Sequence, residues 1–409
     1  MKRRRGWRVK LYRPVGWATV LLFLAGGCGR PARIPGTDPG LLSRMAEVRR
    51  GPQHALLLSG SGLTACLPVA DRGEAPPPLP VEGLYLDGFK LLAGWSWSGL
   101  EGAAADSGSP ARIRPDAILR PVAAGLMERL TLDPERPAAV LELTGRSKGE
   151  VEWAPWMDLR PITVPVAATV TRYDARERIL FIFGPDSLTL ALAARGDWVS
   201  VPARRSVEYA VDDPPLEEVA TVEEPGRFLF PPGGEARIGI GVARRAAVAA
   251  ELARGAEKNP GALRKRATAR VLAELNRAPF SCADPDLEAV AAWDRWLLLR
   301  HYLPGLHGGF VRRPPLDTER DPGADGIALP AAFWAAAGDT LFDGLLAGRL
   351  DPAVAASDPE GTALALAGWA EWVDLTGRTA HLANEAKDLA VVLENLPIDG
   401  GRLQPPMVT

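Results

Sequence analysis

Carboxyl side chains in the last third of the chain have the type and spacing that acid/base chemistry requires. Six of them fall in a Pro/Gly-rich loop or at the start of a predicted helix: Asp317, Glu319, Asp321, Asp325, Asp358 and Glu360. Two carboxyl groups about 5 to 10 Å apart can protonate a leaving oxygen and activate a nucleophile, as in glycoside hydrolysis. Asp325 and Asp358 are the catalytic candidates. The alternative is that the loop acids are solvated and that Asp358 caps a helix whose dipole favours Glu360.

Tryptophan pairs are a second feature with chemical potential, because an indole face can stack on the apolar face of a sugar ring. The pairs are Trp95 and Trp97, Trp153 and Trp156, Trp293 and Trp296, and Trp369 and Trp372. The last two pairs have i, i+3 spacing in predicted helices, which is typical of core packing. Trp153 and Trp156 flank Pro155 and precede Asp158 and Arg160. We therefore name Trp153, Trp156 and Arg160 as candidate substrate-binding residues, with a domain-interface role as the alternative.

Other catalytic and metal-binding arrangements are not visible in the sequence. The four histidines show no metal-ligand spacing: His54, His301, His307 and His381. No Cys-x-x-Cys, serine-histidine, cysteine-histidine or phosphate-loop pattern occurs. Cys66 and Cys282 are far apart in the sequence, so we expect each to be a small buried side chain. The sequence predicts no metal and no cofactor.

The N-terminal segment has the three zones of a secretory signal. Seven basic residues and no acid precede the apolar run 15–24, which is too short to span a bilayer. Small residues then lead to Cys28, and the segment Leu24–Cys28 resembles the lipobox that lipoprotein signal peptidase recognises, one residue out of register. An uncleaved signal anchor is the alternative. Since Gly29 and not Asp follows Cys28, lipidation predicts an envelope protein anchored in the outer membrane and facing the periplasm.

Net charge limits the classes of partner. The formal charge of the chain is −2, and removal of the seven basic residues before Cys28 leaves −9 for residues 28–409. A chain with this charge lacks the basic stripe that neutralises phosphates, so a nucleic-acid partner is not expected. We expect membrane contact to come from the lipid on Cys28.

The first part of the chain has the pattern of a β-sandwich. Ten short apolar runs recur between turn residues: Ala55–Leu58, Leu84–Leu92, Val122–Leu130, Ala138–Leu143, Ile162–Tyr173, Arg178–Phe183, Leu188–Ala193, Val207–Val211, Arg227–Phe230 and Ala236–Val242. No helical pattern separates them, which favours antiparallel sheets packed face to face.

The second part changes to a helical period. Two charged amphipathic stretches, Arg244–Arg254 and Pro260–Arg277, predict a pair of linker helices. Asp284 is a suitable N-cap for a helix that starts at Pro285. Helices over 357–376 and 379–395 are close enough in sequence to form an αα-hairpin.

These patterns divide the chain into five segments. We expect a signal peptide (1–27), a tether (28–45), a β-sandwich domain (46–243), linker helices (244–280) and a partial αα-hairpin domain (281–409). The predicted fold class is thus multidomain, an N-terminal antiparallel β-sandwich followed by αα-hairpins of an incomplete (α/α) toroid.

Several segments carry a resemblance to a known family: Gly83–Leu92 with Trp95, Glu128–Leu132, Trp156–Arg160, Gly326–Pro330 and Asp358–Gly377. With the domain layout, they resemble the glycogen-debranching enzymes of the amylo-α-1,6-glucosidase type, a six-hairpin glycosidase-like group. The resemblance implies a carbohydrate-related function with glucan as substrate. Where the family has Trp-Gly-Arg-Asp, this chain has Arg320–Asp325, without the tryptophan.

Length leaves two functions open. A closed barrel of six αα-hairpins needs about 200 residues, whereas residues 282–409 number 128. The first hypothesis is therefore an envelope lipoprotein related to α-1,6-glucosidases, with a shortened helical domain. The alternative is a non-catalytic lipoprotein that binds carbohydrate or protein. An incomplete toroid exposes apolar helix faces, so a protein partner covering the helical domain is also expected.

Overall fold

A computed structural model gives the structure of the protein. It describes residues 39–48, 55–59, 63–68, 82–100, 111–123, 125–145, 147–162, 167–213, 216–276, 283–303, 309–310, 362, 366, 390–391, 398–399 and 402–403. For 39, 47–48, 55–59, 68, 201–221, 294–295, 298–303, 309–310, 398–399 and 402–403 it describes the backbone alone. Among the described residues, no helix combines the length and the apolar character that crossing a membrane demands.

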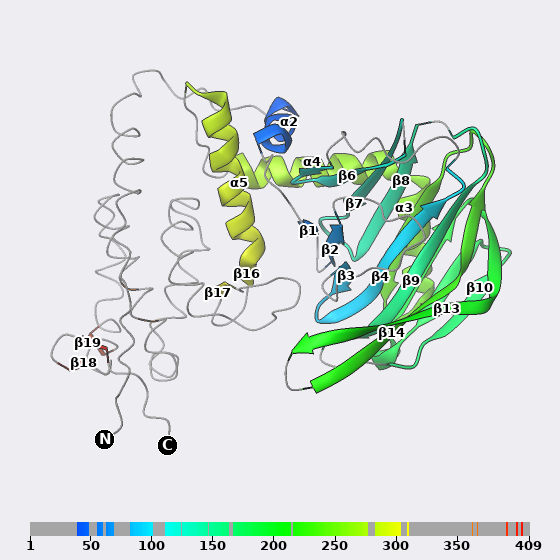
Figure 1. Ribbon diagram of the computed structural model, residues 1–409. Coiled ribbons are helices and arrows are strands. Elements are labelled where there is room, and N and C mark those ends of the chain that lie inside the picture. The colour runs from blue at the N-terminus through cyan, green and yellow to red at the C-terminus, as the bar shows by residue number, and fades with distance from the viewer. Residues whose placement is uncertain are drawn as a thin grey trace, which may run out of the picture.

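Two antiparallel sheets form the body of the molecule (Figure 1). Sheet A has the order β1 (Ala55–Ser59), β2 (Leu63–Pro68), β3 (Gly83–Leu86), β4 (Phe89–Ser98), β9 (Val151–Pro161), β14 (Leu216–Phe230) and β13 (Asp197–Asp213). Sheet B has the order β10 (Val170–Asp174), β11 (Ile179–Phe183), β12 (Thr189–Ala194), β15 (Arg237–Ala243), β8 (Ala138–Thr144), β7 (Leu126–Leu132), β6 (Ala117–Ala123) and β5 (Arg112–Arg114). The prediction of an antiparallel β-sandwich is confirmed.

Two predicted strands are in fact hairpins. The run Leu84–Leu92 turns at Asp87 and Gly88, whose φ angles of 42° and 82° fit a two-residue turn of the type that joins twisted strands. The run Val122–Leu130 turns at Gly125, where φ is 73°. Apolar residues on both sides of a tight turn hide it from a pattern search. Strands β2 and β5 have no counterpart among the predicted strands, β9 is matched only over Trp156–Arg160, and β13 and β14 extend well beyond their predicted runs.

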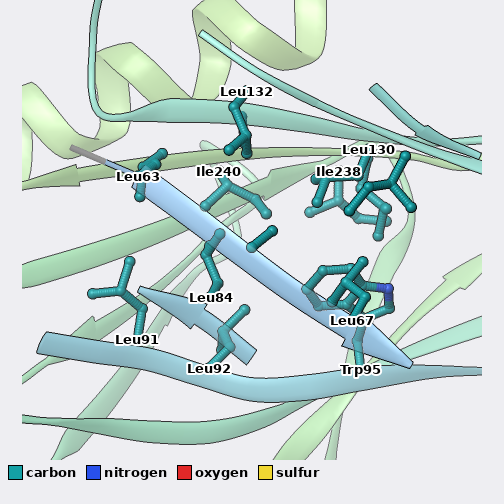
Figure 2. Close-up of a cluster of buried hydrophobic side chains, with 14 of the residues drawn as sticks. Leu63, Leu67, Leu84, Leu91, Leu92, Trp95, Leu130, Leu132, Ile238 and Ile240 are labelled. Atoms are coloured by element: carbon teal, nitrogen blue, oxygen red, sulfur yellow. The ribbon is translucent and has the colours of Figure 1, made fainter. Parts of the chain in front are cut away.

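The core fills the space between the sheets. Figure 2 shows leucines of β2, β3 and β4 pointing toward Leu130, Leu132, Ile238 and Ile240 of sheet B. Each such side chain contributes roughly 1.5 to 3 kcal/mol when fully buried. Further along, Trp153 lies 6.5 Å from Trp95 and 6.1 Å from Phe228 between ring centroids.

Two helices cover the outer face of sheet B: α3 (Ala246–Lys258) and α4 (Pro260–Asn276), while a short 3-10 turn, η1 (Pro185–Ser187), joins β11 to β12. α3 approaches so closely that a Cβ on Gly239 would lie 2.0 Å from the Ala253 carbonyl oxygen. Glycine in β15 therefore sets the distance between helix and sheet. From α4, Arg264 and Arg266 pair with Glu142 at 2.5 Å and with Asp133 at 2.6 Å.

Helix α5 (Pro285–His301) starts as the sequence predicts. The Asp284 side chain accepts hydrogen bonds from the backbone N–H groups of Asp286 and Leu287 at 2.9 and 3.3 Å, so Asp284 is the N-cap. A two-stranded hairpin, β16 (Tyr302–Leu303) with β17 (Gly309–Phe310), follows α5.

An additional helix precedes the sandwich. α2 (Pro39–Val48) packs against α5 and the β5 edge, and it starts within the segment 28–45 that the sequence predicts as a tether. The Trp293 indole N–H donates to the Met45 carbonyl, and Leu42 and Met45 are fully buried.

The last part of the chain is described only in small pieces. Thr362, Leu366, Ala390 and Val391 are helical, within the two helices predicted there. Two further short strands, β18 (Ile398–Asp399) and β19 (Arg402–Leu403), pair antiparallel with each other. The remainder of the predicted αα-hairpins lies outside the described residues.

Candidate functional site

The face of sheet A that points away from sheet B carries the candidate site. Along β9, Trp153 and Leu159 belong to the core between the sheets. Because side chains alternate along a strand, Trp156, Asp158 and Arg160 share the opposite face. With Lys90 of β4, these three residues form what we call the outer cluster.

A carboxylate held between two cations is the centre of the outer cluster. The register places Lys90 directly opposite Arg160. Asp158 accepts a hydrogen bond from Arg160 Nε at 2.6 Å through Oδ1 and lies 3.0 Å from Lys90 Nζ through Oδ2. All three side chains are buried. Buried charges of this kind need close partners, and the short contacts supply them.

Burial sets the charge behaviour of Lys90. Loss of hydration lowers the pKa of the Lys90 ammonium, and attraction to Asp158 opposes that shift. Arg160 lowers it further and Glu82 raises it. The outer cluster therefore contains a lysine whose proton is less tightly held than usual.

Three more residues with polar groups lie near Lys90. Its ammonium is 5.9 Å from the centre of the Tyr85 ring, and the Tyr85 hydroxyl donates to the Glu82 carbonyl oxygen at 3.4 Å. Burial, and then the charge of Glu82, raises the pKa of the Cys66 thiol to about 11. Cys66 is buried and free of a disulfide, as the sequence predicts, and its thiol is protonated at neutral pH.

Trp156 is the apolar member of the outer cluster. It packs with Ala93 of β4 and Val222 of β14, and only 2% of its surface is exposed. Among the described residues, no acceptor lies within hydrogen-bond distance of its indole Nε1. An indole N–H without an acceptor in a buried position is a costly arrangement, of about 1 to 3 kcal/mol.

A second set of ion pairs continues along sheet A. Arg227 donates to Glu224 through Nε and to Glu152 through Nη1, both at 2.6 Å, and Ser98 donates to Glu152 at 3.0 Å. The hydrogen bond from Arg227 lowers the pKa of Glu152, and the bond to Glu224 raises the pKa of Arg227. Both carboxylates are engaged as acceptors, and the lowered pKa of Glu152 favours its charged form.

The opposite side of sheet A has a different polar group, which we call the inner cluster (Trp95, Trp97, Arg120 and Glu128). Glu128 accepts the indole N–H groups of Trp95 and Trp97 at 2.7 and 2.6 Å. Arg120 lies opposite Glu128 across β6 and β7 and donates to both carboxylate oxygens at 3.0 Å. The inner cluster links the two sheets through satisfied hydrogen bonds.

The structure separates the predicted substrate-binding residues. Trp156 and Arg160 share the outer cluster, whereas Trp153 is fully buried between the sheets, where its ring contacts other aromatic rings. The catalytic candidates Asp325 and Asp358, and the lipidation candidate Cys28, lie outside the described residues.

Sequence reasoning missed Lys90 as a member of this site. The signal was present, because a single lysine interrupts the apolar strand Phe89–Ser98. Its partners, however, are about 70 residues away in the chain, and only the β4–β9 register brings them together. Asp158 and Arg160 could have been paired from their i, i+2 spacing in a strand.

Comparisons with known proteins find no matching family model and no matching curated protein. Among solved structures, the chain is similar to a family GH92 alpha-mannosidase from Bacteroides thetaiotaomicron, with 11% identity and a TM-score of 0.39, covering 78% of this chain and 56% of that one. It is also similar to a bacterial glucoamylase complexed with acarbose, with 9% identity and a TM-score of 0.39, covering 84% and 67%.

A third similar structure is a putative kojibiose phosphorylase from the human microbiome, with 7% identity and a TM-score of 0.36, covering 78% of this chain and 48% of that one. The chain thus spans about half the length of the mannosidase and phosphorylase chains that it matches. At this level of similarity the comparisons assign neither an activity nor a substrate to this protein.

Proposed function

We propose that this protein is an envelope lipoprotein that binds glucan or a related carbohydrate and is related to the α-1,6-glucosidases of the glycogen-debranching type. The observation that carries the proposal is the gathering of Trp156, Asp158 and Arg160 on one face of β9, opposite Lys90. The resemblance of segments along the chain to that family supports the choice of glucan.

The groups in the outer cluster suit a polyhydroxy ligand. An indole offers an apolar face to a pyranose ring, while a guanidinium and an ammonium donate to hydroxyl oxygens and a carboxylate accepts from hydroxyl hydrogens. The ion pairs of Asp158 fix these groups before any ligand arrives, which lowers the entropy cost of binding. Because all four side chains are buried in this structure, sugar contact requires that the groups covering them move aside.

Catalysis requires a carboxyl pair, and Asp325 and Asp358 are the proposed members. The test is glucose release from a branched limit dextrin by the full chain, measured beside Asp325→Asn and Asp358→Asn variants. Release that either substitution abolishes supports the glycosidase. Asp286→Asn is a suitable control, since Asp286 is an exposed acid in the first turn of α5.

A non-catalytic carbohydrate-binding protein is the second candidate function. It is favoured by the state of the carboxylates on the described part of sheet A, because Asp158, Glu152 and Glu224 are all committed to cations. An acid/base pair needs a group that can exchange its proton with substrate. Binding of limit dextrin without glucose release, lost in Arg160→Met, would select this candidate.

Lipidation of Cys28 is part of the proposal and has its own test. In bacterial cells, the chain should fractionate with membranes and carry labelled fatty acid, and Cys28→Ala should abolish the label. A Gly29→Asp variant should change the membrane to which the protein is sorted. A chain that carries no label would contradict the lipoprotein assignment and leave the carbohydrate proposal intact.

A further inference from the structure

Strand β13 forms one edge of sheet A. Among the strands that the structure describes, it pairs only with β14, regularly from Arg205 to Asp213 after an irregularity that begins at Ser200. β14 in turn pairs with β9 no further than Glu223. The end of the β13–β14 hairpin is therefore a two-stranded ribbon at the margin of the sandwich (Figure 1). Long edge strands tend to pair with another chain unless something prevents it.

The sequence of this edge strand is self-complementary. Alternate positions lie on one face of a strand, and here one face carries Arg205, Val207, Tyr209, Val211 and Asp213. The order reads basic, apolar, aromatic, apolar, acidic. When such a strand meets an antiparallel copy of itself, the basic end lies opposite the acidic end and the apolar positions lie opposite each other.

Symmetry limits the possible registers. A two-fold axis perpendicular to the sheet keeps each face of both copies on the same side, so a position can only oppose one of the same parity. With Tyr209 on the axis, Arg205 opposes Asp213, Val207 opposes Val211, and Glu208 opposes Ala210. With the axis at Glu208, two glutamates oppose each other.

With the axis at Ala210, Glu208 opposes Asp212. Like charges directly opposite each other destabilise a strand pair. Of these three registers, only the one centred on Tyr209 avoids a pair of like charges. In that register, Arg205 of each copy lies opposite Asp213 of the other copy.

We propose that this chain forms a symmetric dimer in which β13 pairs with β13 of a second copy about Tyr209. Sheet A of one copy then continues into sheet A of the other. Position 207 lies opposite Val222, which packs with Trp156, so positions 205, 207, 209, 211 and 213 are in register with the outer face of sheet A. The dimer places the outer clusters of the two copies on the same side of one sheet. This inference does not depend on the proposed carbohydrate function.

Charge exchange across the axis is the decisive test. The full chain is purified in excess detergent, so that each micelle holds a single protein anchor, and its mass is measured by light scattering corrected for detergent. Arg205→Asp alone and Asp213→Arg alone should each weaken the dimer about tenfold or more, because both symmetry-related contacts become repulsive. The double variant restores opposite charges across the axis and should dimerise like the parent chain.

A neighbouring arginine provides the matched control. Arg204→Asp makes the same charge change as Arg205→Asp, but position 204 lies outside the segment Arg205–Asp213 that pairs in the proposed register, so the dimer should stay intact. Circular dichroism and thermal melting of every variant check that the fold is retained. Cross-linking gives an independent readout, since Tyr209→Cys, in a chain lacking Cys66 and Cys282, should link to itself with a short thiol reagent more readily than Ala210→Cys.

Three results would overturn the proposal. The first is a parent chain that is monomeric at a concentration on the order of 10 to 100 micromolar, because a dimer of ordinary affinity would be populated at that concentration. The second is a dimer that neither single charge reversal weakens. The third is a double variant that stays monomeric while folded, since restored complementarity then fails to restore pairing.

Discussion

The inner and outer clusters are both built around one buried carboxylate on a strand, yet their surroundings differ. Glu128 faces one cation, Arg120, and two neutral donors from Trp95 and Trp97. Asp158 faces two cations, Lys90 and Arg160. The inner cluster thus balances its charge with a group that always stays protonated, whereas the outer cluster contains a lysine that can release a proton.

This difference indicates different roles. A closed network with every donor and acceptor matched stabilises one packing of two sheets. A cluster that contains a lysine of lowered pKa can adjust its charge to what lies beside it. We therefore regard the inner cluster as part of the fold and the outer cluster as the binding element. Four predictions test this division.

The largest effect is expected for the inner carboxylate. Glu128→Gln removes a carboxylate that pairs with Arg120 at 2.9 Å, and the buried guanidinium cannot lose its proton in response. The free energy of unfolding should fall by about 3 to 5 kcal/mol, measured by urea denaturation. Glu150→Gln, at an exposed position, is the control and should change stability little. A loss below roughly 1 kcal/mol for Glu128→Gln would mean that the two sheets do not depend on this network.

A smaller loss is expected for the outer carboxylate. In Asp158→Asn, Lys90 can become neutral because its pKa is already lowered, and the cost of an unpaired charge is partly avoided. Stability should fall by about 2 to 3 kcal/mol, and adding Lys90→Met should recover part of that loss. Binding of limit dextrin should fall in Asp158→Asn and stay unchanged in Glu128→Gln protein that remains folded. If Asp158→Asn costs more stability than Glu128→Gln, the division between the clusters is wrong.

Alkaline pH should lower the free energy of unfolding through the thiol of Cys66, which lies near Lys90 of the outer cluster. Its pKa rises from 9.0 to about 11 on folding, so the unfolded chain loses this proton first. The stabilisation is complete below pH 9 and disappears as the pH rises through 11, a change of about 2 kcal/mol. Lys90 acts in the opposite direction, because a lowered lysine pKa makes the folded state gain stability as the pH rises.

Unfolding measured from pH 8 to pH 11 in the parent chain and in Cys66→Ala separates the two contributions. The variant should lack the alkaline loss and retain the gain from Lys90. An identical pH profile in both proteins would show that the thiol does not titrate as its burial implies.

The two clusters also mark the limit of prediction from sequence. Local signals predicted the β-rich first part, the helix pair around Pro260 and the Asp284 cap, because periodicity and capping act over a few residues. The pairing of Lys90 with Asp158, and of Trp95 with Glu128, depends on which strands lie side by side. Register between distant strands is set by the packing of the whole sandwich, and no short segment contains it.

The two tryptophans of β9 show the same limit of prediction within a single strand. Trp153 and Trp156 were treated together because they flank Pro155, but the alternation of β9 sends them to opposite faces. An irregular register between β4 and β9 at Leu92 and Gly94 made the face of each residue hard to assign in advance. The sequence identified the strand that carries the candidate site, and only the structure distinguishes its two sides.

The smallest stability effects are expected for these two tryptophans, and they separate the faces most directly. Replacing either indole by phenylalanine removes a buried N–H that has no acceptor among the described residues, which offsets part of the packing loss. Trp153→Phe should destabilise the protein by about 1 to 2 kcal/mol and leave carbohydrate binding unchanged, and Trp156→Phe should cost about 1 kcal/mol or less and weaken binding. Calorimetric titration with limit dextrin beside urea denaturation measures both quantities. If binding follows Trp153 and not Trp156, sugar recognition does not occur on the outer face of sheet A, and the outer cluster serves the fold as the inner one does.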